Sequence, residues 1–296
     1  MNLQDVGHVY GSREVLRRVS LSVGAGEFFG LVGPNGAGKT TALRIMQGLV
    51  KPSSGLSSTF GATSWPPDRR RNLRIGVQPQ QVALFEQLTV REQVTLFADM
   101  RGMSRIHAVD TATRLGLEDS LTIRQEKLSG GQRQRLSVAC AIIGKPDLLF
   151  LDEPTANVDP VARREMRSLF LELAAAGMSI VYTSHDLNEI AGLCDRVTVL
   201  VQGQVLLTDS PDEISRVSGL TTMEVTSAAS LTILKAAIAG VIGASLTDVG
   251  VTLVATDEAL ATQRILAIDP KARILNRSEP FEETYIRLIA AAGDVR

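Results

Sequence analysis

The most specific chemistry in this chain lies in a glycine-rich stretch near its N-terminus. Residues 33–41 match the pattern G-x-x-x-x-G-K-[ST] of a phosphate-binding loop. Glycines let backbone N–H groups crowd around nucleotide phosphates, Lys39 reaches the terminal phosphates, and the Thr40 hydroxyl completes a Mg²⁺ shell. The residues expected to bind the nucleotide here are Gly33, Pro34, Asn35, Gly36, Ala37, Gly38, Lys39, Thr40 and Thr41.

A pair of carboxylates follows an apolar run later in the chain. Residues 148–151 are Leu-Leu-Phe-Leu, and Asp152 and Glu153 come directly after them. A carboxylate at the end of such a run can hold a Mg²⁺ shell, and its neighbour can orient or deprotonate an attacking water. We assign the first role to Asp152 and the second to Glu153. An ordinary strand followed by an acidic turn is the alternative.

Three single residues are weaker candidates. Gln78 follows an apolar run at 73–77 and is a candidate sensor of Mg²⁺ or of the attacking water, although a surface glutamine is the simpler interpretation. His185 follows the run 179–183 and is a candidate partner of a terminal phosphate. Tyr10 is a candidate for stacking on a base. Structural roles at strand ends are the alternatives for His185 and Tyr10.

A second glycine-containing motif precedes a predicted helix that starts near residue 133. Residues 128–132 read Leu-Ser-Gly-Gly-Gln. Ser129 can cap the helix, while Gly130 and Gly131 expose backbone N–H groups to an anion, with Gln132 beside them. A plain helix cap is the alternative.

The elements that must position these residues alternate between strand and helix from residue 1 to about 212, as in an α/β core. Apolar runs at 28–32, 148–151, 179–183 and 197–201 predict buried strands, and spacing at 41–49 predicts a helix after the phosphate loop. Between 78 and 127 the pattern is helical. Thr89 and Glu92 form a capping box, and the following helix is predicted to present Val90, Val94, Phe97 and Met100 on one face.

The C-terminal part, residues 216–296, has a different pattern. Its order before the last helix reads strand, helix (231–241), strand, strand, helix, strand, which predicts a small ferredoxin-like α+β domain. The last helix is predicted to begin at Pro280.

Composition excludes several functions. Lys plus Arg number 31 against 32 Asp plus Glu, so no net basic field attracts nucleic acid, and Arg69, Arg70 and Arg71 are interpreted as solvated surface. The two cysteines are far apart and predict reduced thiols in a cytosolic protein. The longest apolar stretch, 231–246, contains a lysine and is too short to span a bilayer. We expect no signal peptide, since the N-terminus is polar.

The order of these motifs resembles that of the ATP-binding cassette (ABC) family over about residues 1–212. The resemblance implies a P-loop NTPase cassette of the α/β class, with antiparallel N-terminal strands and a helical subdomain at about 79–127. It makes Tyr10 the adenine-stacking aromatic, Gln78 the loop glutamine that acts in catalysis and at the metal, and His185 the switch histidine. Residues 33–41 become the Walker A loop, 148–153 Walker B and 128–132 the signature motif, and Asp159 belongs to the loop that crosses the dimer.

The resemblance also implies how the protein works. The family places the signature motif of one subunit against the Walker A loop of another, so ATP and Mg²⁺ would be held in a homodimer or in a pair with a similar chain. Residues 281–288 look like those of bacterial exporter subunits of the drug and polysaccharide type. We therefore expect a peripheral ATPase at the cytoplasmic face of the cell membrane, docked on a separate permease through residues 78–103. An import motor, or a soluble ATPase acting on ribosomes or DNA, is the alternative.

The chain departs from the family pattern at three places. Asn157 stands where a glycine is usual, Val158 replaces the more usual leucine, and residues 56–60 are rich in serine where an apolar strand is expected. Asparagine tolerates left-handed backbone better than most residues. None of these changes removes a group with a predicted catalytic role.

Overall fold

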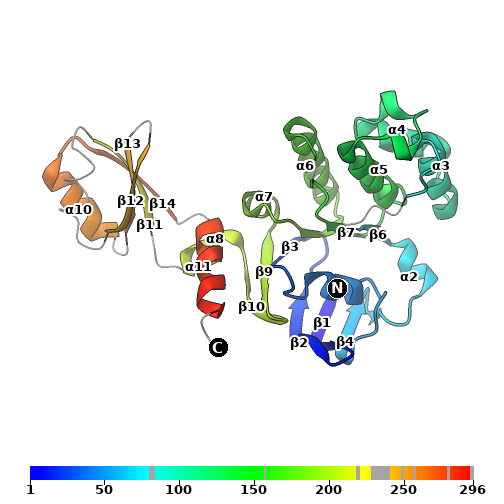
Figure 1. Cartoon of the computed structure of the whole chain (residues 1–296), viewed down its shortest axis with the longest axis horizontal. Helices are drawn as coiled ribbons and strands as arrows, with labels where there is room; N and C mark the ends of the chain where they lie inside the picture. Colours follow the sequence, from blue (N-terminus) through cyan, green and yellow to red (C-terminus); the bar gives the residue numbers. More distant parts are fainter. Residues whose placement is uncertain are drawn as a thin grey trace. The chain divides into compact units, whose positions relative to one another are not determined.

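Two units make up the chain. The computed structural model describes residues 1–79, 84–156, 158–217, 221–227, 241–247, 250–255, 258–278 and 281–293 (Figure 1). Contacts divide it into Met1–Asp209 and Ser210–Arg296. The division falls before Pro211, which begins helix α8 (Pro211–Val217), whereas the sequence pattern places the end of the first domain after this proline. Proline suits the first turn of a helix because its missing N–H is not needed there.

A largely parallel six-stranded sheet forms the centre of the first unit. Its order is β10-β9-β3-β8-β7-β6, and only β10 runs antiparallel to its neighbour. The strands β3 and β8 are buried along their whole length, as continuous apolar runs in parallel sheets must be. The six strands are β3 (Phe28–Val32), β6 (Ile75–Gln78), β7 (Leu148–Asp152), β8 (Ser179–Thr183), β9 (Arg196–Val201) and β10 (Gln204–Asp209).

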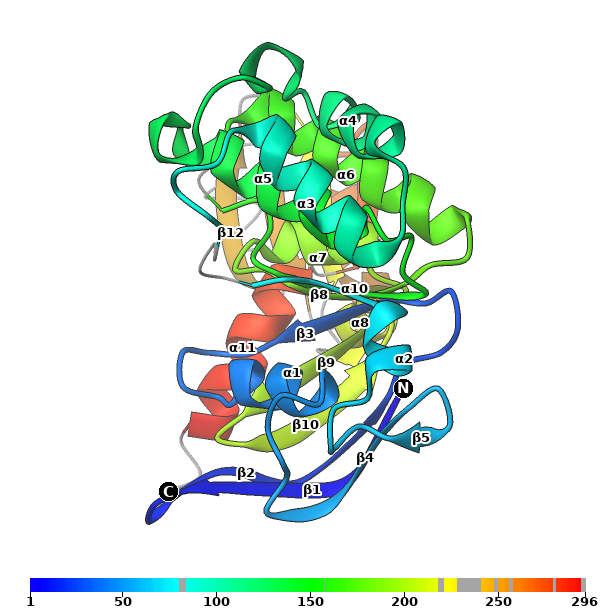
Figure 2. The same cartoon turned by 90° about the vertical axis from the view of Figure 1, so that its right-hand side faces the viewer.

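An antiparallel sheet of order β2-β1-β4-β5 covers the helix that follows the phosphate loop. It consists of β1 (Asn2–Tyr10), β2 (Arg13–Ser22), β4 (Ser54–Thr59) and β5 (Ala62–Thr63). Helix α1 (Lys39–Met46) lies between this sheet and β3 (Figure 2). One apolar cluster joins side chains of both sheets with those of α1, so the antiparallel sheet and the central sheet share a core.

The serine-rich strand β4 is built on hydroxyl pairs. Ser57 and Thr59 are buried, and each lies within hydrogen-bond distance of Ser64 Oγ, at 2.8 and 3.0 Å. Ser57 also donates to the carbonyl oxygen of Ile45 in α1 at 3.3 Å. Buried polar groups are tolerated when they are hydrogen-bonded. The strand therefore keeps its place without the apolar residues that the family pattern predicts.

The helical subdomain comprises α3 (Val90–Arg101), α4 (Arg105–Arg114) and α5 (Gly130–Ile142), which pack on one another (Figure 1). It therefore extends past the predicted limit at 127. Two short 3-10 turns, Glu118–Ser120 and Gln125–Lys127, connect α4 to α5. The capping box at the start of α3 is present, but Met100 is 67% exposed, and α3 buries Gln93 and Ala98 beside Val90 and Val94.

Two further helices connect the parallel strands. Helix α6 (Pro160–Ala175) joins β7 to β8, and α7 (Leu187–Leu193) joins β8 to β9. Among the residues that the structure describes, no helix combines the length and the apolar character needed to cross a bilayer.

The second unit contains an antiparallel sheet of order β12-β13-β11-β14. Its elements are α8, β11 (Thr221–Thr226), β12 (Val241–Thr247), β13 (Gly250–Ala255), α10 (Glu258–Ile268), β14 (Arg273–Ser278) and α11 (Phe281–Gly293). Ala261 and Ile265 of α10 join the buried side chains of β11 and β13 in a separate apolar cluster. This arrangement agrees with a ferredoxin-like unit. Positions 231–240 of the predicted helix lie outside the described residues, and its last position, Val241, instead begins strand β12.

The arginine cluster at 69–71 is not all solvated surface. Helix α2 (Arg69–Leu73) turns Arg71 inward, where it is only 7% exposed, while Arg70 stays in solvent. The Arg71 guanidinium donates hydrogen bonds to the carbonyl oxygens of Thr63, Ser64 and Pro66. The prediction was therefore wrong for Arg71, because three unpaired backbone acceptors at β5 and the loop after it require a buried donor.

We expect Arg71→Ala to destabilise the first unit by about 2–3 kcal/mol, since buried carbonyls lose a charged donor. That loss lowers Tm by roughly 5–10 °C in a unit of this size. Thermal unfolding followed by circular dichroism measures it. Arg70→Ala is the matched control and should leave Tm nearly unchanged; equal Tm values for the two variants would contradict the assignment.

Candidate functional site

The phosphate loop depends on glycines with left-handed backbone. Gly36 has φ +79° and Gly38 has φ +104°. A Cβ on Gly38 would lie 2.7 Å from Leu16 Cδ2 and 3.0 Å from the Val15 carbonyl oxygen, so β2 leaves no space for a side chain there. Gly38 is also the N-cap of α1 and supplies no side-chain cap. The N–H groups of the first turn are therefore left for an anion.

The Lys39 ammonium group lies against the loop that precedes it. Its Nζ donates to the carbonyl oxygens of Gly33 at 2.6 Å and Pro34 at 3.3 Å. Burial lowers the pKa of Lys39, while the nearby carboxylates of Glu153 and Asp152 act in the opposite direction. A positive charge is thus held between the loop and the acidic pair, where an anionic ligand would favour the charged form further.

Asp152 ends β7 in a position set by the neighbouring strand. Thr183, the last residue of β8, pairs with Asp152 in the parallel register, and its hydroxyl donates to Asp152 Oδ1 at 2.6 Å. Burial raises the pKa of Asp152, and the Thr183 hydrogen bond partly offsets that effect. A partly desolvated carboxylate of this kind gains when a cation arrives.

The backbone at Glu153 is strained and firmly held. Its φ is +53°, in the left-handed region that non-glycine residues rarely adopt. Its N–H donates to both the carbonyl oxygen and the hydroxyl of Thr183, each at 3.1 Å. Its carbonyl oxygen accepts from Gln134 Nε2 in α5 at 3.0 Å. Because these hydrogen bonds hold the strained backbone in a single conformation, the direction of the Glu153 side chain is restricted.

The Glu153 carboxylate contacts the ring of His185. His185 Nε2 lies 2.8 Å from Glu153 Oε1, and with its proton on Nε2 the ring donates a hydrogen bond to the carboxylate. The contact joins the loop after β7 to the loop after β8. Glu153 is largely buried while His185 is more than half exposed, so the carboxylate is shielded on one side and the ring faces open space.

A cavity of about 320 Å³ brings most of the predicted residues together. Its lining includes Arg13 and Val15, which no sequence pattern singled out. They enter because the β1–β2 hairpin folds back beside Tyr10. The cavity is lined by Tyr10, Arg13, Val15, Asn35, Gly36, Ala37, Gly38, Lys39, Thr40, Thr41, Asp152, Glu153 and His185.

Gln78, a predicted catalytic and metal residue, does not line that cavity. It ends β6, pairs with Leu151 in the sheet and is fully buried, and its Nε2 donates to the Pro79 carbonyl oxygen at 2.7 Å. Its Oε1 is a buried acceptor without a hydrogen-bond partner among the described residues. The Gln78 amide therefore lies on the strand next to that of Asp152, and its Oε1 is available to accept a hydrogen bond or to bind a cation.

The signature-motif residues and Asp159 also lie outside the cavity. Ser129 and Gln132 form a capping box at the start of α5, in which the N–H of each residue donates to the side-chain oxygen of the other. Gly130 and Gly131 lie in the first turn of this helix. Asp159 caps α6 by accepting from the N–H groups of Val161 and Ala162. Within one chain, these five residues support helix starts and do not meet the phosphate loop.

Comparisons with known proteins find the ABC transporter family and several ATP-binding proteins. A family model described as ABC transporter matches residues 16–156. The linearmycin resistance ATP-binding protein LnrL of Bacillus subtilis is 32% identical over 231 residues, which cover 76% of this chain and 74% of that protein. The Nod factor export ATP-binding protein I of Burkholderia orbicola is 38% identical over 215 residues, 71% of each chain. The lipopolysaccharide export system ATP-binding protein LptB of Acidithiobacillus ferridurans is 35% identical and covers 72% and 91%.

Solved structures match the same architecture. An ATP-binding subunit of an ABC transporter superposes with a TM-score of 0.69 at 28% identity, over 74% of this chain and 92% of that one. A dimeric post-hydrolysis state of the ATP-binding cassette MJ0796, bound to ADP and Pi, gives a TM-score of 0.66 at 28% identity, over 71% and 97%. With the phosphate loop, the acidic pair and His185 around one cavity, the chain belongs to the ABC transporter family as an ATP-binding subunit and is an ATPase.

Proposed function

We propose that this subunit hydrolyses ATP with Mg²⁺ in a dimer and so drives export through a separate membrane permease. The observation that carries the proposal is the single cavity that gathers Lys39 and its loop, Asp152, Glu153 and His185. These are the groups needed to bind a triphosphate, hold a cation and activate water.

Each group has a defined task in hydrolysis. Lys39 and the N–H groups at the start of α1 bind the phosphates, and Tyr10, 47% exposed at the cavity, is free to stack on the base. The Glu153 carboxylate accepts a proton from the attacking water. His185 keeps that carboxylate in place through its Nε2–H and faces the position of the terminal phosphate.

The residues present fit a Mg²⁺ ion. Mg²⁺ takes oxygen ligands and uses one or two protein groups beside phosphates and waters. The Thr40 hydroxyl and the Asp152 carboxylate line the same cavity. Gln78 ends the strand next to that of Asp152, and its Oε1 has no hydrogen-bond partner among the described residues. The described residues hold no group of three or more His, Cys, Asp or Glu that could hold a metal without phosphates. Bound Mg²⁺ would neutralise the developing phosphate charge.

The rest of the site is proposed to come from a second subunit. Ser129, Gly130, Gly131, Gln132 and Asp159 are apart from the chain's own cavity, and α5 begins with glycine N–H groups able to meet an anion. The MJ0796 cassette is dimeric in its solved structures. ATP bound by two subunits at once favours the closed pair, and loss of the terminal phosphate removes that preference.

Export is favoured over import by the names of the relatives. Two relatives, the Nod factor export ATP-binding protein I and the lipopolysaccharide export system protein LptB, are named for export. The described helices contain no membrane span, so we propose a separate permease and a place for this subunit at the cytoplasmic face of the cell membrane. Import remains the alternative.

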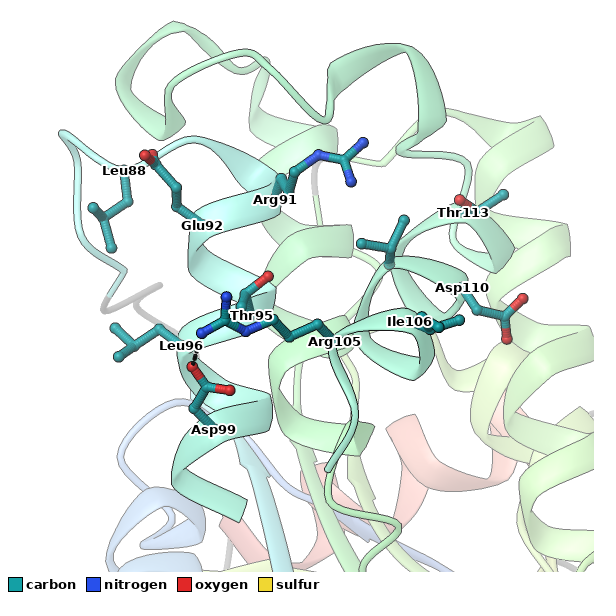
Figure 3. Close-up of a pocket in the computed structure, with 11 residues that line it drawn as sticks. Leu88, Arg91, Glu92, Thr95, Leu96, Asp99, Arg105, Ile106, Asp110 and Thr113 are labelled. Atoms are coloured by element: carbon teal, nitrogen blue, oxygen red, sulfur yellow. Dashed lines mark hydrogen bonds and ion pairs between the residues drawn. The ribbon is translucent and has the colours of Figure 1, made fainter. Parts of the chain in front are cut away.

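The helical subdomain offers a docking surface for that permease. A hollow of about 890 Å³ lies between α3 and α4, with Leu88, Leu96 and Ile106 beside charged residues, and Arg105 pairs with Asp99 across it (Figure 3). Ile106 is 84% exposed, and Phe85 and Met100 are also exposed on this subdomain. Apolar side chains gathered on a surface mark an interaction site, and the proposed occupant is a cytoplasmic segment of the permease.

Lys39→Ala should weaken ATP affinity about 10- to 100-fold, because a charged donor to the phosphates is lost. Isothermal titration calorimetry with a slowly hydrolysed ATP analogue measures the change. Lys51→Ala, an exposed lysine in the same unit, is the control. Unchanged affinity in Lys39→Ala would refute the phosphate-site assignment.

Glu153→Gln should bind ATP normally but hydrolyse it about 10²- to 10⁴-fold more slowly, since the general base is gone. Gel filtration with ATP and Mg²⁺ should then give a stable dimer. An enzyme-coupled phosphate assay gives the rate, with Glu165→Gln, an exposed change of the same kind, as the control. Near-normal turnover in Glu153→Gln would remove it as the base.

Ile106→Glu should abolish co-purification with a co-expressed candidate permease, because a charge replaces the exposed apolar side chain at the hollow. The ATPase rate of the isolated subunit should not change. Leu171→Glu, at a partly exposed leucine on α6, is the control. Equal permease recovery from Ile106→Glu and wild type would place the docking surface elsewhere. Transport assays in vesicles of both orientations decide between export and import.

A further inference from the structure

Glu189 is a buried carboxylate close to the hydrolytic residues. It lies in α7 and is only 1% exposed. Its Oε2 accepts hydrogen bonds from the hydroxyls of Thr155 at 2.9 Å and Ser184 at 3.0 Å. Burial of a carboxylate is costly unless hydrogen bonds compensate for the lost water. Both hydroxyls bind Oε2 and come from two different loops, while Oε1 is buried without a hydrogen-bond partner among the described residues.

Those loops carry the proposed catalytic pair. Thr155 follows β7 and is two residues after Glu153, while Ser184 follows β8 and directly precedes His185. Glu189 thus joins the two loops through Thr155 and Ser184. The contact of His185 Nε2 with Glu153 Oε1, at 2.8 Å, joins the same two loops. Both links span the same gap between neighbouring strands.

The hydroxyl groups in this cluster surround the Glu189 carboxylate. The Thr155 hydroxyl donates to Glu189 and lies 3.5 Å from the Tyr182 hydroxyl, which also has Glu189 as a hydrogen-bond partner. The Asp186 N–H donates to Ser184 Oγ at 3.1 Å, which leaves the Ser184 proton for Glu189. The acceptor that orders both hydroxyls is the Glu189 carboxylate.

Packing does not fill the space between the two loops. A cavity of about 160 Å³ lies there, lined by Glu153, Thr155, Ala156, Arg163, Ser184, His185 and Asp186. The ion pair of Arg163 with Asp186 also crosses this region, but at 3.6 Å and partly exposed it adds little. The Glu153 N–H is already bound to Thr183, so the link through Glu189 adds a second polar connection between the two loops, on Thr155 and Ser184.

We propose that Glu189 is a positioning residue that fixes the separation of the Glu153 and His185 loops through Thr155 and Ser184. It does not touch the substrate. The inference rests on the proposed roles of Glu153 and His185, because its effect on hydrolysis passes through them. It predicts that Glu189 controls the rate of the chemical step and leaves nucleotide binding alone.

Steady-state ATPase kinetics of the full chain test this. In Glu189→Gln the acceptor is a neutral amide oxygen, and kcat should fall about tenfold because charge-assisted hydrogen bonds are the stronger ones. KM for ATP should change less than twofold, since the phosphate loop is untouched. Glu165→Gln, the same substitution at an exposed glutamate of α6, should retain both constants.

Thr155→Val removes one donor and keeps the carboxylate. The double variant Thr155→Val/Glu189→Gln should be no slower than the slower single variant, because both changes act on the same Thr155–Glu189 hydrogen bond. Thr155→Val and Ser184→Ala decide the question by the same criteria if Glu189→Gln does not fold. Thermal unfolding of each variant ensures that kcat refers to folded protein.

A kcat of Glu189→Gln within twofold of wild type would overturn the inference. A rise in KM at constant kcat, or additive losses in the double variant, would also overturn it. Glu153→Gln measured in parallel separates the two proposals. Retained turnover in Glu153→Gln would refute the proposed function itself, whereas lost turnover there with normal Glu189→Gln would refute only the role of Glu189.

Discussion

The parallel register of β7 with β8 is the constraint on which the site depends. It sets Asp152 opposite Thr183, so one threonine fixes the Asp152 carboxylate through its hydroxyl and the Glu153 N–H through its hydroxyl and carbonyl oxygens. A slip of one residue would turn every side chain of the strand to the other face. The apolar residues of β7 and β8, buried on both sides, prevent such a slip and so keep the acidic pair at the edge of the sheet.

The sequence predicted the central strands and the phosphate loop because both depend on local rules. Continuous apolar runs give buried parallel strands, and the glycines at 36 and 38 are required by left-handed backbone. It did not predict Arg13 at the cavity or Arg71 in the interior, since tertiary contacts decide these positions. A threonine that orders two neighbours, such as Thr183, likewise has no signature in sequence. Met100 was predicted to share one helix face with Val90 and Val94, yet its side chain is 67% exposed while theirs are buried.

Buried polar groups in this chain are concentrated where segments distant in sequence must keep a fixed distance. The Ser57, Thr59 and Ser64 hydroxyls join β4 to the turn after β5. The Arg71 guanidinium donates hydrogen bonds to the backbone carbonyl oxygens beside them. Glu189 does the same for the two loops of the candidate site. Apolar packing would give comparable stability at such places, but it has no preferred direction. Hydrogen bonds specify both distance and orientation, which a site for hydrolysis requires.

The cavity of one chain contains only part of the proposed ATP site. In the proposed roles it supplies the Lys39 cation, the Glu153 base and the Asp152 carboxylate for the metal, but the glycine N–H groups at the start of α5 and the acidic cap of α6 lie elsewhere in the same unit. If every donor were at one cavity, ATP would bind one chain fully and would have no effect on the association of two. A ligand shifts an equilibrium only by its difference in affinity between the states. In the proposed dimer the phosphate contacts are divided between two chains, and this division would create that difference in affinity, so that ATP binding would favour closure of the two subunits.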